Sequence, residues 1–142
     1  MNASVPLAKY CQLTDLNNGI WLFMFSESSN RAVDEWYVWQ SYLKEHPTPR
    51  EDNRVRMLLD MRKSGALPLL YTLQQGREWR KDQSDINTFR VQIALLLKQF
   101  PSYQQSYIKL IKDGVNIFTM SQVEVEVFFD DQQTAVDWLL KP

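Results

Sequence analysis

The sequence predicts an α/β fold with a mixed, mostly parallel five-stranded sheet and about four helices. The segment Val123–Phe129 alternates in polarity and precedes two aspartates and a short amphipathic stretch, which is typical of a closing strand and helix. The segments at 54–60 and 89–97 are apolar over several consecutive residues, as strands covered on both faces are. Segments with helical spacing separate these strands, and strands joined by helices form parallel pairs.

The chain opens with a predicted hairpin. Residues Leu7 to Leu13 alternate loosely, and Ile20–Phe25 is a continuous apolar run. Between them, Asn18-Gly19 supplies the residues preferred in a type I′ turn. Because the second run is apolar on both faces, we expect a central strand there.

Three further segments have the spacing of amphipathic helices: Arg31–Glu45, Leu67–Lys81 and a third from Pro101 through Met120. Gly114 leaves an alternative for the third, in which the helix ends at Lys112 and 115–120 forms a short strand. The side chains expected to face the core are Ala32, Trp36, Trp39 and Leu43 in the first helix, Leu69, Leu70, Leu73 and Trp79 in the second, and Tyr107, Ile111, Val115 and Phe118 in the third.

The last strand and helix predict how the sheet ends. Glu124 and Glu126 point away from the valine face of 123–129. The face that carries these glutamates is therefore exposed to solvent, or the strand lies at an edge of the sheet. Asp130, followed three residues later by Gln133, resembles a capping box. The order is two strands and then helices alternating with strands, in a single domain over residues 1–142.

Composition excludes several function classes. Sixteen Lys and Arg against seventeen Asp and Glu give a net charge of −1, which argues against binding nucleic acid. No secretory signal and no long apolar run is present, so we expect a cytoplasmic protein without stable membrane insertion. Cys11 is the single cysteine, expected to be buried, and His46 is the single histidine.

The sequence predicts neither a metal centre nor a nucleotide cofactor. One cysteine and one histidine cannot build a zinc site, and His46 before Pro47 is better explained as a helix-end cation than as a catalytic base. Glycine-rich nucleotide loops and the nucleophile motif of hydrolases are missing. Asp130-Asp131 is interpreted as a helix cap, so no catalytic, cofactor or metal residue is assigned.

Two candidate surfaces remain. Ligands of open α/β sheets gather at the carboxyl ends of parallel strands, where we expect Asp60, Arg62, Ser64, Lys98 and Ser26. Backbone N–H groups near 66–67 would add an anion site at a helix start. On the first helix, Val38 and Tyr42 lie on a second apolar stripe, which marks them as a candidate protein interface.

Three segments resemble the STAS superfamily, and within it the SpoIIAA-like anti-sigma-factor antagonists of bacteria. They are Val55–Met61, with its Leu-Asp-aliphatic ending, Arg90–Leu95, and Val127–Asp131 together with Ala135–Leu139. The resemblance implies this fold and a non-enzymatic regulatory role. The chain departs from the family because 66–70 reads Ala-Leu-Pro-Leu-Leu where phosphorylatable members have Asp-Ser-Ser-Gly.

The leading functional hypothesis is therefore a non-enzymatic regulatory or protein-interaction module that binds a protein partner or a second copy of itself. The alternative is a binder of a small apolar ligand or lipid, because related folds include a lipid-carrying branch and the chain is rich in Trp, Phe and Met. A third hypothesis is an enzyme that uses Asp60 with Ser64 or Lys98. Phosphorylation of Ser64 is a minor hypothesis.

Overall fold

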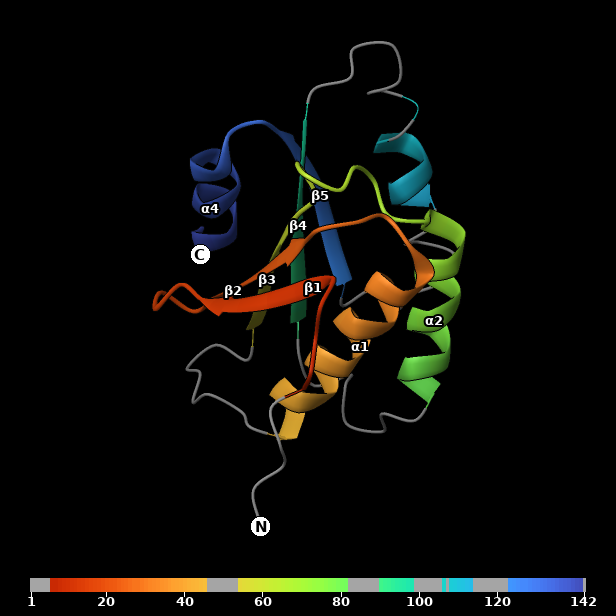
Figure 1. Cartoon of the computed structure of the whole chain (residues 1–142). Coiled ribbons are helices and arrows are strands. Elements are labelled where there is room, and N and C mark those ends of the chain that lie inside the picture. Colours follow the sequence, from red (N-terminus) through yellow and green to blue (C-terminus); the bar gives the residue numbers. More distant parts are fainter. Residues whose placement is uncertain are drawn as a thin grey trace.

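A five-stranded mixed sheet with helices on both faces organises the computed structural model (Figure 1). The structure describes residues 6–45, 54–81, 90–98, 106, 108–113 and 123–141. The strands are β1 (Cys11–Asp15), β2 (Ile20–Phe25), β3 (Arg54–Asp60), β4 (Arg90–Leu97) and β5 (Val123–Phe129). The expected α/β class with a mixed five-stranded sheet is confirmed.

The helices lie close to where the spacing predicted them. They are α1 (Asn30–Glu45), α2 (Leu69–Lys81), a helical segment at 108–113 and α4 (Gln132–Leu140). Much of the predicted Pro101–Met120 helix, including the choice between helix and strand at 115–120, lies outside the described residues.

Strand order in the sheet follows chain order, β1-β2-β3-β4-β5. The hairpin pair β1–β2 is antiparallel, and the three following pairs are parallel. Right-handed crossovers that always step in the same direction place their helices on one face. Accordingly α1, α2 and the 108–113 segment lie on one side of the sheet, and α4 lies on the other (Figure 1). Of the two alternatives predicted for the strand at 123–129, a solvent-exposed glutamate face or an edge position, the edge position is confirmed.

The β1–β2 loop differs from the predicted type I′ turn, which needs positive φ at both Asn18 and Gly19. The positive angles belong instead to Asn17 (φ 62°) and Gly19 (φ 88°). Two side chains shape this loop: Asp15 accepts from the Asn17 amide at 2.8 Å, and Asn18 accepts from the Ile20 amide at 3.2 Å. Asn and Asp side chains commonly bond to backbone two residues on in turns, and here they do so in a loop that covers 16–19.

The sheet separates two hydrophobic cores because successive side chains of a strand point to opposite faces. In β3, Met57 and Leu59 belong to the larger core under α1, whereas Leu58 belongs to the smaller core under α4. The smaller core contains Ile20, Leu22, Leu58, Ala94, Leu96, Ala135, Val136 and Leu139.

The start of α4 corrects the predicted cap by one residue. Asp131 is the N-cap, and its carboxylate accepts from the Gln133 amide at 3.0 Å and from the Thr134 hydroxyl at 2.7 Å. Asp130 instead has a φ of 67°, a left-handed conformation that turns the chain between β5 and α4. Both aspartates therefore have structural roles, and the predicted cap is formed by Asp131.

Candidate functional site

An apolar pocket lies between α2 and the face of the sheet that α1 also covers. Its volume is about 110 Å³, and it is partly open to the surface. The described side chains that line it come from four helical or loop segments and three strands: Trp36, Tyr37, Leu59, Met61, Leu67, Leu69, Thr72, Leu73, Gly76, Ile93, Leu95, Ile111, Val123 and Val125.

The lining is suited to an uncharged, apolar occupant. Not one of the described lining residues carries a charge, and only Tyr37 and Thr72 bring a hydroxyl group. The hydroxyl of Tyr37 donates to the backbone carbonyl of Thr72 at 2.9 Å, and that of Thr72 to the carbonyl of Pro68 at 2.7 Å. Both hydroxyl protons therefore already take part in hydrogen bonds within the protein.

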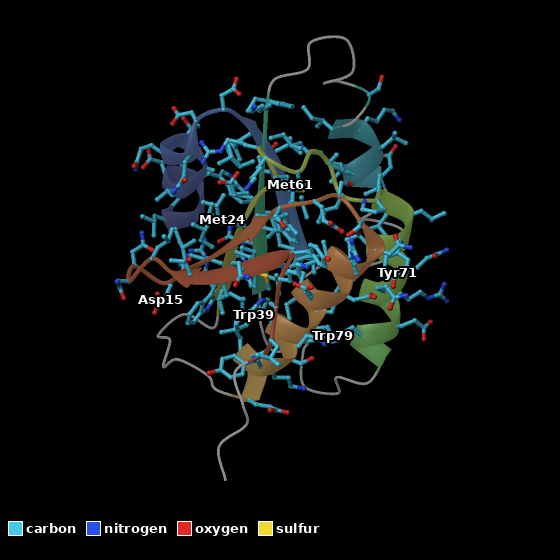
Figure 2. The ribbon with its side chains drawn as sticks, viewed as in Figure 1. Asp15, Met24, Trp39, Met61, Tyr71 and Trp79 are labelled. Atoms are coloured by element: carbon cyan, nitrogen blue, oxygen red, sulfur yellow. The ribbon has the colours of Figure 1, made fainter. Side chains whose placement is uncertain are left out.

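The pocket exists because α2 packs on α1 rather than down onto the sheet. Besides the Tyr37–Thr72 bond, the Tyr71 hydroxyl donates to Asp34 at 2.6 Å, and the Trp79 indole donates to Ser41 at 2.9 Å. Figure 2 labels Tyr71 and Trp79, the two α2 side chains in these bonds. Gly76 lets the helices approach, since a Cβ there would lie 2.7 Å from the Tyr37 hydroxyl oxygen. Space therefore remains between α2 and strands β4 and β5.

The orientation of α2 corrects one prediction from the sequence. Leu70 was expected to face the core with Leu69 and Leu73, but its side chain is 60% exposed. Leu69 and Leu73 line the pocket and are only partly buried. A helix supported by another helix, with a hollow beneath it, presents a narrower apolar stripe than one lying flat on a sheet.

The predicted strand-end cluster is a structural ion pair, centred on Asp60 and Arg62. Asp60 is 6% exposed at the end of β3, and its carboxylate accepts from Arg62 Nε at 3.0 Å and Nη2 at 2.9 Å. Arg62 also donates to the carbonyl of Asp130 and to the Gln132 side chain, each at 3.2 Å. The guanidinium therefore ties the end of β3 to the start of α4.

The environment of Asp60 favours its charged form. Burial pushes the pKa of the carboxyl upward, but the hydrogen bonds and positive charge of Arg62 outweigh it, and the pKa falls below its usual value. The same pairing raises the pKa of Arg62. An ionised carboxylate with its oxygens bound to a guanidinium is poorly placed to act as a general base.

The other predicted members of this cluster do not join it through any contact seen among the described residues. The Ser64 hydroxyl donates to the Gly65 carbonyl at 2.8 Å, and Ser26 and Lys98 have exposed side chains. Helix α2 begins at Leu69, beyond the N–H groups at 66–67 that were considered for an anion site. Nearby, the Ser28 hydroxyl donates to the carbonyl of Ala66.

The two candidate interface residues have different surroundings. Val38 is 51% exposed on α1. Tyr42 is partly buried against the larger core, and its ring meets that of Trp39 edge-on at 5.8 Å. Of these two residues, therefore, only Val38 presents an exposed apolar side chain.

Cys11 is fully buried, as predicted, and burial together with the negative charge of Glu35 raises the pKa of its thiol.

Across the described ranges, no group of three or more His, Cys, Asp or Glu residues is arranged to hold a metal. His46 lies outside those ranges. In the same parts of the chain, no helix is long and apolar enough to cross a bilayer.

No family model, curated protein or solved structure matches this chain. The STAS-like identity accordingly stays a prediction from the sequence.

The pocket is the feature that the sequence did not reveal. Of the lining residues, the sequence predicted that Trp36, Leu69, Leu73 and Ile111 face the core, and it placed Val123 and Val125 on one face of the last strand. Gly76 was the one available signal, because a glycine inside a helix often marks a close approach of another element. A pattern of apolar residues does not distinguish a filled interior from a hollow one.

Proposed function

We propose that this chain is a non-enzymatic binding protein for a small apolar molecule, which it holds in the pocket between α2 and the sheet. The observation that carries the proposal is the hollow of about 110 Å³ with an uncharged lining. For comparison, an engineered apolar cavity of about 150 Å³ in another protein binds benzene. The pocket therefore suits a single aromatic ring or a short alkyl chain, with anything larger extending through its open side.

Binding of toluene to the full chain tests this proposal. We expect saturable shifts of methyl NMR signals from Ile93, Ile111 and Val125, which line the pocket. The variant Val125→Phe fills the site and should weaken toluene binding at least about tenfold. Val38→Phe makes the same change on an exposed surface and is the matched control. Unsaturable shifts, or equal binding by both variants, would sink the proposal.

A second candidate is the STAS-like regulatory module that self-associates or binds a protein. The supporting observation is that α1 and α2, which pack together, each carry an exposed aliphatic side chain: Val38 is 51% exposed and Leu70 is 60% exposed. In this proposal the protein works in the cytoplasm of a bacterium.

Sedimentation velocity over a range of concentrations tests self-association through this surface. We expect a dimer in the wild type that Val38→Asp weakens, whereas Leu110→Asp, at a side chain 59% exposed on the 108–113 segment, leaves it unchanged. A wild-type chain that is monomeric at every concentration would contradict self-association.

A further inference from the structure

Helix α2 is attached to the molecule differently from the other helices. α1 buries Ala32, Val33, Trp36 and Trp39, and α4 buries three side chains. Of the α2 side chains that the structure describes, Leu69 to Trp79, none is buried. Elements that bury little apolar surface open at a lower free energy than the core does.

Helix α2 is held by hydrogen bonds to α1, by the Tyr37–Trp79 ring contact at 6.2 Å, and by the packing of Leu69 and Tyr71 against the larger core. Tyr71 binds Asp34, Trp79 binds Ser41, and the Thr72 carbonyl accepts from Tyr37. Each such bond contributes about 1 kcal/mol to stability, and the exposed ones exchange readily with water. Next to this contact with α1, α2 borders the hollow through Leu69, Thr72, Leu73 and Gly76.

The chain just before α2 is firmly anchored. Leu67 is 8% exposed in the larger core, and Met61, at the end of β3, is 1% exposed. Between them, Gly65 has a φ of 82°, and its amide donates to the Met61 carbonyl at 2.9 Å. Rotation of α2 about Pro68 would therefore lift its apolar side from the pocket without disturbing the strands.

We propose that α2 is the lid of the apolar pocket: it swings away from α1 to admit the ligand and is held shut by its hydrogen bonds to α1. This inference rests on the proposed function, because it assigns the entry route to the same pocket. Closing the lid buries Leu69 and Leu73 against the ligand, so a bound molecule stabilises the closed state. The Tyr71–Asp34 and Trp79–Ser41 bonds set how often the lid opens.

The test removes those two bonds without touching the pocket lining. In the double variant Tyr71→Phe with Ser41→Ala, amide hydrogen exchange in α2 should rise about tenfold. Exchange in β3 and β4 should stay as in the wild type. Toluene entry and exit rates from NMR line shapes should rise together, which leaves its Kd within about threefold. The control Thr134→Val removes a hydroxyl bond at the cap of α4 and should affect exchange in α4 alone.

Two results would refute the proposal that α2 is a lid. One is α2 amides as protected as those of β4 in the wild type, and the other is toluene rates unaltered by the double variant. Fast α2 exchange without any toluene binding would instead refute the proposed function and leave α2 as a mobile helix. Saturable toluene binding together with slow amide exchange in α2 would refute the proposal that α2 is a lid, and it would leave the proposed function intact.

Discussion

Asp60 illustrates how one buried carboxylate joins two distant segments. Its side chain is 7% exposed, that of Arg62 is 34% exposed, and their nearest atoms lie 2.9 Å apart. Arg62 reaches on to Gln132, which follows it by 70 residues in sequence. The pair therefore stabilises the fold at the junction of β3 with α4.

The variant Asp60→Asn should lower the free energy of unfolding by about 2 kcal/mol at pH 7, because Arg62 loses its buried charged partner. The folded state depresses the pKa of Asp60, so its contribution is present above the unfolded pKa of about 3.9 and is lost as pH falls further. The difference between wild type and variant should thus shrink between about pH 5 and pH 2.

Urea unfolding across this pH range measures the effect. Asp113→Asn, in an exposed pair with Lys109, is the control and should change stability by less than about 0.5 kcal/mol. A deficit for Asp60→Asn that stays constant down to pH 2 would contradict the role given to its charge.

The sequence predicted part of this site. It placed Asp60 and Arg62 together at the carboxyl edge of the sheet, because a strand ends there. It did not predict the hydrogen bond from Arg62 to Gln132, because that contact depends on where α4 packs relative to β3. Lys98 and Ser26 were expected at the same edge because each follows a strand of the sheet, yet the structure shows no contact between them and Asp60.

At the scale of elements, the close approach of α1 and α2 depends on Gly76. Alanine favours a helix over glycine by about 1 kcal/mol, but its methyl group would lie 2.7 Å from the Tyr37 hydroxyl oxygen. The next nearest atom, the ring carbon that bears the hydroxyl, lies 3.6 Å away, an ordinary contact.

We therefore expect the effect of Gly76→Ala to change sign with residue 37. In the wild-type background it should destabilise by about 1 kcal/mol, as Tyr37 gives up its bond to Thr72. In a Tyr37→Phe background it should stabilise by about 0.5–1 kcal/mol. Thermal unfolding of the four proteins in this double-mutant cycle measures both effects, and the same sign in both backgrounds would refute the contact.

Helical spacing located α2 to within two residues of its observed start but misjudged the direction of Leu70. Spacing reports which side chains share a stripe, whereas the width of the buried stripe depends on what the helix packs against. For α1, which lies on the sheet, the predicted Trp36 and Trp39 are buried as expected.

At the scale of the molecule, α4 is the helix that covers the smaller core in the described part of the chain. Leu139 is fully buried there, and the adjacent Leu140 is 45% exposed. Leu139→Ala should destabilise the protein by about 2–4 kcal/mol, because it leaves a cavity next to the sheet. Leu140→Ala should cost less than about 1 kcal/mol. Chemical denaturation of both variants measures this difference, and similar losses would show that α4 is not the cover of this core.

The order of the strands also has a consequence for how the chain is made. Synthesis runs from the N-terminus, so β2, β3 and β4 are complete before α4 exists. The crossover helices can cover one face of the sheet as each new strand is added. Ile20, Leu22 and Leu58 on the other face stay exposed to water and to other nascent chains until residues 132–140 emerge. A chain truncated before residue 132 is therefore expected to aggregate rather than to form a smaller stable domain.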